Sequence, residues 1–90
     1  KCKMIKYILI SRRKSVTLPT NEDFVTWMRR NDIQYWKTND DFMEEYAHRK
    51  ILFEKINLRH NSEDEFTEDL IKNGLLRTEP ATRRLWRVFR

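Results

Sequence analysis

The sequence contains one glycine, two prolines and one cysteine among its 90 residues. A single glycine excludes a glycine-rich loop of the kind that cradles phosphate groups. A single cysteine, Cys2, excludes an internal disulfide, so we expect an intracellular, reducing compartment, either the cytoplasm or the nucleus. The longest apolar run is Tyr7 to Ile10, far short of the roughly 20 residues that span a bilayer. We therefore expect no membrane partner.

Recognisable catalytic or metal-binding patterns are also missing. The only histidines, His48 and His60, have no cysteine near them and no nucleophile motif beside them, so neither a zinc site nor a nucleophilic centre is expected. The acidic clusters within 40–45 and 63–69 have the spacing of helix starts and solvated helix faces. We expect a non-enzymatic chain without a metal or another cofactor.

Ninety residues are enough for one domain, near the lower size limit for a chain that folds on its own core. Three Trp, three Tyr and five Phe supply large buried areas. The chain begins with Lys1 rather than Met, which suggests that the domain, residues 1–90, is cut from a longer protein. A charged fraction of 37% with little glycine favours short loops and a mostly helical fold.

The net charge of +5 is unevenly distributed. Residues 1–14 carry six positive charges and no negative one, residues 77–90 carry five positive charges against Glu79, and the middle has eight basic and thirteen acidic residues. If both ends form strands of one small sheet, their charges gather on one side, and such a patch attracts polyanions. Alternatively, the basic residues protect strand edges against aggregation.

The N-terminal part predicts a strand, a basic loop and a second extended piece. Lys3 to Ile10 is short and rich in aliphatic residues, which favours a strand. Ser11 to Ser15 is polar and basic and predicts a loop, and Val16 to Leu18 predicts a short extended segment before Pro19.

Two helices are predicted in the middle of the chain. The first, about 22–31, has Thr20 or Asn21 as its N-cap and an apolar face that includes Phe24, Trp27 and Met28. The second, about 40–57, has Thr38 or Asn39 as its N-cap and a broad apolar stripe that implies burial on two sides. Between them, Asp32 to Lys37 predicts a short extended segment.

The C-terminal third predicts a capped helix followed by a hairpin. Ser62 with Glu65 forms a capping box, Phe66, Leu70 and Ile71 make the inward face, and Asn73-Gly74 ends the helix. Leu75 to Thr78 and Arg83 to Phe89 then predict two strands joined by a turn at Glu79 to Thr82. The whole order predicts an α+β, winged-helix-like fold with three helices, a small antiparallel sheet and an extra N-terminal strand.

In a winged helix the third helix usually enters the DNA major groove, yet here its predicted outward face is acidic. That face shows Asp64, Glu65, Glu68, Asp69 and Lys72, and phosphates would be repelled by the carboxylates. The predicted nucleic-acid contacts are therefore the basic residues of the wing and the N-terminal edge, which would bind backbone with steep salt dependence. They are Arg12, Arg13, Lys14, Arg77, Arg83, Arg84 and Arg87.

Residues 40–88 also resemble the C-terminal winged-helix domain of poxvirus and phage primase-helicases. A helix with a tyrosine leads there through a serine-containing turn to a helix with an inward phenylalanine and leucine, then to a glycine and a basic, aromatic hairpin. The matching positions are Tyr46, Ser62, Phe66, Leu70, Gly74, Arg84, Trp86 and Val88. The resemblance covers about half of the chain and implies an appendage of a viral DNA-replication protein, whose partners are DNA and other domains or subunits of the parent protein.

The leading hypothesis from the sequence is a non-catalytic nucleic-acid-binding module, with DNA favoured over RNA as its target. The rival hypothesis is a protein-interaction or oligomerisation module. In that case the acidic third helix, through Asp64, Glu65, Glu68 and Asp69, docks a basic partner.

Overall fold

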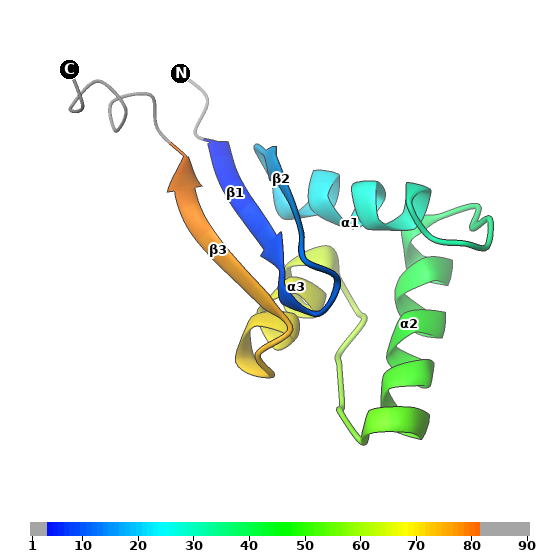
Figure 1. The fold of residues 1–90 in the computed structure, drawn as a ribbon. Helices are drawn as coiled ribbons and strands as arrows, with labels where there is room; N and C mark the ends of the chain where they lie inside the picture. Colours follow the sequence, from blue (N-terminus) through cyan, green and yellow to red (C-terminus); the bar gives the residue numbers. More distant parts are fainter. Residues whose placement is uncertain (1–3, 82–90) are drawn as a thin grey trace, which may run out of the picture.

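The computed structural model describes residues 4–81, which form three helices and a three-stranded antiparallel sheet (Figure 1). The predicted α+β class is confirmed, as is the strand that precedes the first helix. In chain order the elements are β1 (Met4–Leu9), a 3-10 turn η1 (Ile10–Arg12), β2 (Lys14–Leu18), α1 (Asn21–Arg30), α2 (Asn39–Glu54), α3 (Glu63–Lys72) and β3 (Leu76–Ala81).

The sheet has the strand order β2-β1-β3, and β1 pairs antiparallel with both neighbours. Tyr7 and Leu9 are buried whereas Lys6 is exposed, so one face of β1 meets the helices and the other faces away from them. The predicted basic loop is shorter than expected, because Arg13 adopts a left-handed backbone conformation (φ 54°) that reverses the chain. As a result β2 already begins at Lys14.

The predicted turn at Glu79 to Thr82 is wrong over the residues that the structure describes. Glu79, Pro80 and Ala81 continue β3 and pair with β1, where Pro80 lies opposite Ile5. Proline has no N–H to donate, and β3 tolerates it because the strand lies at the edge of this sheet. The predicted return strand, 83–89, lies outside the described residues.

Each helix begins at a residue whose hydroxyl accepts a hydrogen bond from a backbone N–H three residues later. This satisfies one of the donors that a helix start leaves without an intrahelical partner. The caps are Thr20 for α1, Thr38 for α2 and Ser62 for α3, with oxygen to nitrogen distances of 3.1, 3.1 and 3.2 Å. The serine cap at Ser62 is as predicted, and at the other two helices the threonine is the cap rather than the following asparagine.

The two connections between helices differ from the winged-helix expectation. Residues 32–34 and 37 form bends and residues 35–36 have no regular secondary structure. The segment is not a strand, because Arg29 donates to the carbonyl oxygen of Trp36 at 2.8 Å and the Trp36 indole donates to Asp32. The link between α2 and α3 covers residues 55–62, whereas a helix-turn-helix has a turn of about 3–4 residues. The described residues therefore show three helices and a sheet without that tight turn.

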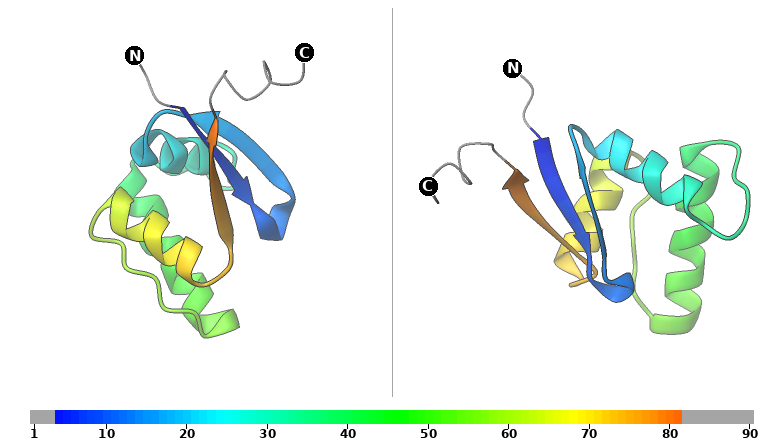
Figure 2. Two further views of the ribbon diagram at one scale, coloured as in Figure 1. Left: turned by 90° about the vertical axis from the view of Figure 1, so that its left-hand side faces the viewer. Right: turned by 45° about the horizontal axis from the view of Figure 1, so that its top comes forward.

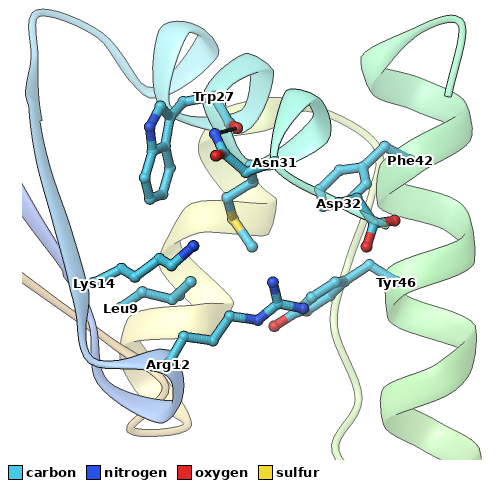
Figure 3. Close-up of a pocket in the computed structure, with 9 residues that line it drawn as sticks. Leu9, Arg12, Lys14, Trp27, Asn31, Asp32, Phe42 and Tyr46 are labelled. Atoms are coloured by element: carbon cyan, nitrogen blue, oxygen red, sulfur yellow. Dashed lines mark hydrogen bonds between the residues drawn. The ribbon is translucent and has the colours of Figure 1, made fainter. Parts of the chain in front are cut away.

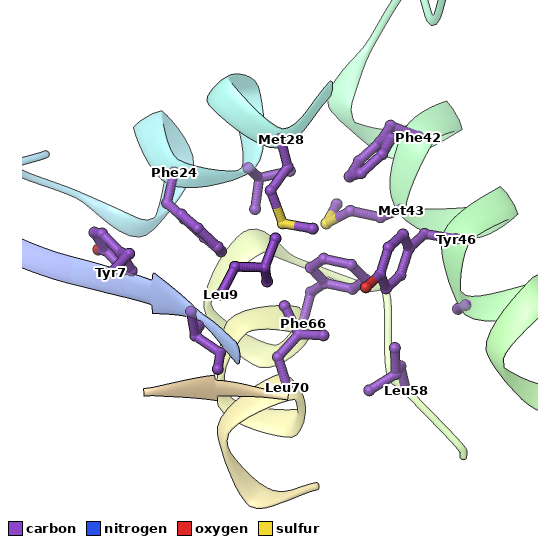
Figure 4. Close-up of a cluster of buried hydrophobic side chains, with 13 residues drawn as sticks. Tyr7, Leu9, Phe24, Met28, Phe42, Met43, Tyr46, Leu58, Phe66 and Leu70 are labelled. Atoms are coloured by element: carbon purple, nitrogen blue, oxygen red, sulfur yellow. The ribbon is translucent and has the colours of Figure 1, made fainter. Parts of the chain in front are cut away.

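The helices lie on one face of the sheet, with α1 and α3 nearest to it and α2 beyond them (Figure 2). The core between them is rich in aromatic rings, among which Tyr7 stacks on Phe24 at 4.4 Å between centroids (Figure 4). Its buried hydrophobic residues are Tyr7, Leu9, Phe24, Val25, Met28, Phe42, Met43, Tyr46, Ala47, Leu58, Phe66, Leu70 and Leu76. This core holds together the elements that carry the surface described below.

The predicted burial of α2 on two sides is wrong for its second half. Phe42, Met43, Tyr46 and Ala47 are buried, but the later apolar residues 51–53 are exposed. Figure 1 shows the reason, since the C-terminal half of α2 runs past the turn that joins β1 to β2. The described residues leave Ile51, Leu52 and Phe53 at that end of the helix 47%, 60% and 79% exposed.

Ile71 was predicted on the inward face of α3 and is instead exposed. Each helical residue turns by about 100°, so Ile71 lies roughly 140° round the helix from the buried Phe66. Thr67 and Asp69 occupy the inward side beside Phe66 and Leu70. One carboxylate that was expected to face outward is thus part of the packed interior.

Candidate functional site

Two adjoining pockets form a groove between the η1 turn and α2. The first is lined by Leu9, Arg12, Lys14, Trp27, Met28, Asn31, Asp32, Phe42 and Tyr46 (Figure 3). The second is lined by Arg12, Tyr46, Arg49, Lys50, Phe53 and Glu54. Arg12 and Tyr46 line both, so the pockets are neighbours. We call the surface formed by Arg12, Lys14, Tyr46, Arg49, Lys50 and Phe53 the cationic groove.

The chain reversal after β1 places two of the cations in this groove. Arg12 ends η1, and Lys14 begins β2 directly opposite Leu9. Residues paired across two strands project from the same face, and Leu9 is buried against the helices. Lys14 therefore projects toward α1, and Arg12 reaches toward Tyr46 (Figure 3). Arg13 lies between them, at the tip of the turn.

Two further cations come from α2, one turn after Tyr46. The guanidinium carbon of Arg49 lies 5.9 Å from the centroid of the Tyr46 ring, and the Lys50 ammonium nitrogen lies 5.5 Å from it. Both distances are within the range of a cation–π contact. Burial raises the pKa of the Tyr46 phenol, whereas the charges of Lys50, Arg12 and Arg49 act to lower it. Side chains from η1 and from α2 thus converge on one tyrosine.

The carboxylates of the groove neutralise only part of this charge. Lys50 forms an ion pair with Glu54 at 2.8 Å, and Arg49 lies 3.7 Å from Asp32. Within residues 4–81, Arg12 and Lys14 form no ion pair with a carboxylate. Four cations and two carboxylates therefore share the groove, which can attract an anion.

The predicted nucleic-acid contacts are only partly brought together. Arg12 and Lys14 lie in the groove, but Arg77 pairs with Ile8 on the face of the sheet that points away from the helices. Arg77 also forms an ion pair with Glu79 at 3.4 Å. Strand alternation turns Arg77 away from Arg12 and Lys14 and onto the face that also carries Lys6, so the cations of the two ends are divided between the groove and the outer face of the sheet. Arg83, Arg84 and Arg87 lie outside the described residues.

Sequence reasoning missed Arg49 and Lys50 because they belong to a region whose overall charge is negative. Their signal was their spacing, three and four residues after Tyr46 on a helix. Such residues lie on the same helix face as the first one. Counting the cations three and four residues from an aromatic residue of a predicted helix, rather than the net charge of each segment, would have identified them.

The acidic residues of α3 already have a partner inside the chain. The guanidinium of Arg59 donates to both carboxylate oxygens of Asp69, at 2.9 and 3.0 Å, and to Glu68 at 3.1 Å. It also lies 3.7 Å from Glu65. The fourth residue of the set, Asp64, accepts a hydrogen bond of 2.8 Å from the Asn21 amide. These carboxylates tie α3 to the chain that precedes it and to α1.

Asp69 was predicted to face outward and is 7% exposed. Besides the guanidinium, the backbone N–H of Arg59 donates to it at 2.8 Å. These hydrogen bonds hold the pKa of the Asp69 carboxyl below its usual range, the side-chain bond from Arg59 being the largest cause. The carboxylate turns inward because it accepts hydrogen bonds from the backbone N–H and the guanidinium of Arg59, which lies in the link between α2 and α3.

His48 and His60 lie closer than their separation in the sequence implies, since both line one surface pocket together with Glu44 and Glu45. Nevertheless, among residues 4–81 no group of three or more histidine, cysteine, aspartate or glutamate side chains is placed to hold a metal ion. The same part of the chain has no helix with the length and apolar character needed to cross a membrane.

Comparisons with protein-family models, with curated proteins and with solved structures gave no match for this chain. The resemblance to the winged-helix domain of primase-helicases stays a prediction.

Proposed function

We propose that the chain is a non-catalytic nucleic-acid-binding module that holds phosphate groups in the cationic groove. The observation that supports this proposal is the convergence of Arg12 and Lys14 with Arg49 and Lys50 on one groove. Phosphates contacted by lysine and arginine release their condensed counterions, and this release supplies much of the affinity for nucleic acid. The predicted resemblance to primase-helicases makes DNA the first ligand to test.

The outer face of the sheet is the weaker candidate, although it also carries basic residues. Lys6 and Arg77 project from that face, but Glu79 lies directly opposite Lys6 and pairs with Arg77. A carboxylate within reach of both cations reduces their attraction for phosphate. In the groove, by contrast, Arg12 and Lys14 are not paired with any described carboxylate.

The rival function, docking of a basic partner by α3, is less favoured by the contacts. Such a partner would have to displace Arg59, which already binds Asp69, Glu68 and Glu65. Asp69 is also too buried to be reached by a partner without rearrangement of the link between α2 and α3. A structural role for this acidic set accounts for its geometry.

Fluorescence anisotropy with labelled DNA tests the proposal. We expect binding at about 25 mM salt that weakens steeply toward 200 mM. If all four groove cations contact phosphates, the slope of log K against log salt concentration approaches about −3 for a single strand. Absence of binding at the lowest salt would refute the proposed function.

A pair of double variants tests the location, because each removes one lysine and one arginine. The groove variant Arg12→Ala with Lys14→Ala should weaken binding by about tenfold or more and reduce the salt slope by roughly 1.4. The control variant, Lys6→Ala with Arg77→Ala, loses the same charge from the outer sheet face and should change affinity by less than about threefold. Equal losses in both variants would contradict the groove and indicate a general effect of net charge.

A further inference from the structure

The cationic groove ends at an exposed aromatic ring. Phe53 lines the same pocket as Arg12, Arg49 and Lys50, and it is 79% exposed. It lies on the half of α2 that the rest of the described chain leaves uncovered. A phenylalanine in this position adds little to the core, but its ring is accessible beside three cations.

Cations and an accessible ring together match the chemistry of an unpaired nucleic-acid strand. In a duplex the faces of the bases are covered by stacking, so a protein surface reaches mainly phosphates and groove edges. In a single strand each base offers a π-face, and stacking on an aromatic side chain contributes alongside the phosphate contacts. Binding to a duplex backbone would give the Phe53 ring no base face on which to stack.

We infer that the cationic groove binds single-stranded nucleic acid in preference to duplex, and that Phe53 stacks on an unpaired base. This inference rests on the proposed function of the same groove. The cations of η1, β2 and α2 hold the backbone along the groove, and Phe53 at its end receives a base. Tyr46 does not take this role, because its ring is buried beneath Arg49 and Lys50.

The test compares an oligothymidylate of about 20 nucleotides with a duplex of the same length, which exceeds the roughly 4–16 nucleotides of many single-strand sites. The unmodified chain should bind the single strand about tenfold more tightly. Phe53→Ala should weaken single-strand binding roughly fivefold to a hundredfold and leave duplex binding within about twofold. Phe53→Trp should restore the single-strand affinity, since it also offers a ring for stacking.

Tyr35→Ala is the matched control, because Tyr35 is 85% exposed but lies in the loop between α1 and α2, outside the groove. It should change neither affinity. Equal affinity of the unmodified chain for single strand and duplex would overturn the inference and leave the proposed function standing. The same holds if Phe53→Ala weakens single-strand and duplex binding equally, or weakens neither of them. Failure to bind either DNA would instead defeat the proposed function itself.

A second copy of this chain is the other occupant that the exposed residues 51–53 could accept. Sedimentation at the concentrations of the binding assay distinguishes the two. The inference expects a monomer with or without Phe53→Ala. A dimer that Phe53→Ala dissociates would assign the ring to self-association and overturn its role in binding a base.

Discussion

Two phenylalanines at opposite extremes of burial give the sharpest test of the described packing. Phe66 is 0% exposed, and its ring lies edge-on to Tyr46 and Phe42 with centroids 5.6 and 6.4 Å away. Replacing it with alanine removes the ring and leaves a cavity, which costs about 3–5 kcal/mol for a buried phenylalanine. Phe53, at 79% exposure, has few contacts to lose, so Phe53→Ala should change the free energy of unfolding by less than about 0.5 kcal/mol.

These losses are large against the stability of a small domain. A chain of 90 residues is expected to have a free energy of unfolding of about 5–13 kcal/mol. With a urea dependence of about 1.5 kcal/mol per molar, typical of small domains, Phe66→Ala should lower the urea midpoint by roughly 2–3 M. Phe53→Ala should lower it by less than about 0.4 M.

The assay is a urea titration followed by tryptophan fluorescence and by far-ultraviolet circular dichroism. If Phe66→Ala does not fold, Phe66→Leu keeps most of the volume and should give a smaller loss of about 1–2 kcal/mol. Equal destabilisation by Phe53→Ala and Phe66→Ala would contradict the exposure of Phe53, since it would mean that the end of α2 is packed. A folded Phe53→Ala variant also makes the binding experiment interpretable.

Three further predictions concern helix ends and pH. Ser62→Ala removes the hydroxyl that accepts from the N–H of Glu65 and should cost about 1 kcal/mol in urea unfolding. Lys55→Gly should stabilise the chain by roughly 0.5 kcal/mol, because Lys55 has a φ of 57°, which favours glycine. Because Arg59 lowers the folded-state pKa of Asp69, Asp69 contributes stability above its unfolded pKa of about 3.9, and this contribution disappears as the pH falls through the lower folded value. Asp69→Asn should therefore be destabilising at pH 7 by urea titration, and its deficit should shrink below about pH 4.

Local chemistry made the starts of the helices predictable. A hydroxyl followed by a run of acidic and apolar residues is a sufficient signal, because the cap involves only groups within one turn. Ser62 was identified in this way, and so was Thr38 as one of two alternatives. The C-terminal end of α2 was not, since an apolar stripe shows which residues avoid water and does not show where the packing partner ends.

The strand β3 shows how tertiary pairing overrides a local signal. Glu79 and Pro80 resemble a turn, and nothing within their own segment argues otherwise. In the structure β1 offers an edge along which β3 continues, and Pro80 is tolerated there because β3 is the last strand of the described sheet. The long-range partner, rather than the local residues, decides the conformation.

Only half of the cationic groove was predictable, because its cations come from segments that meet through the tertiary fold. Arg12 and Lys14 are part of an obvious basic cluster near the N-terminus. Arg49 joins them only because the fold places α2 beside the η1 turn. This placement cannot be inferred from the charge of either segment. Arg77 fails to join them because of a one-residue alternation along β3.

The most direct test of the groove is an amide chemical-shift titration of the ¹⁵N-labelled chain with oligothymidylate at low salt. We expect the largest shifts on η1, the start of β2 and the second half of α2, at Arg12, Lys14, Arg49, Lys50 and Phe53, while Lys6 and Arg77 change little. Shifts confined to α3, to the outer face of the sheet or to residues 82–90 would contradict it.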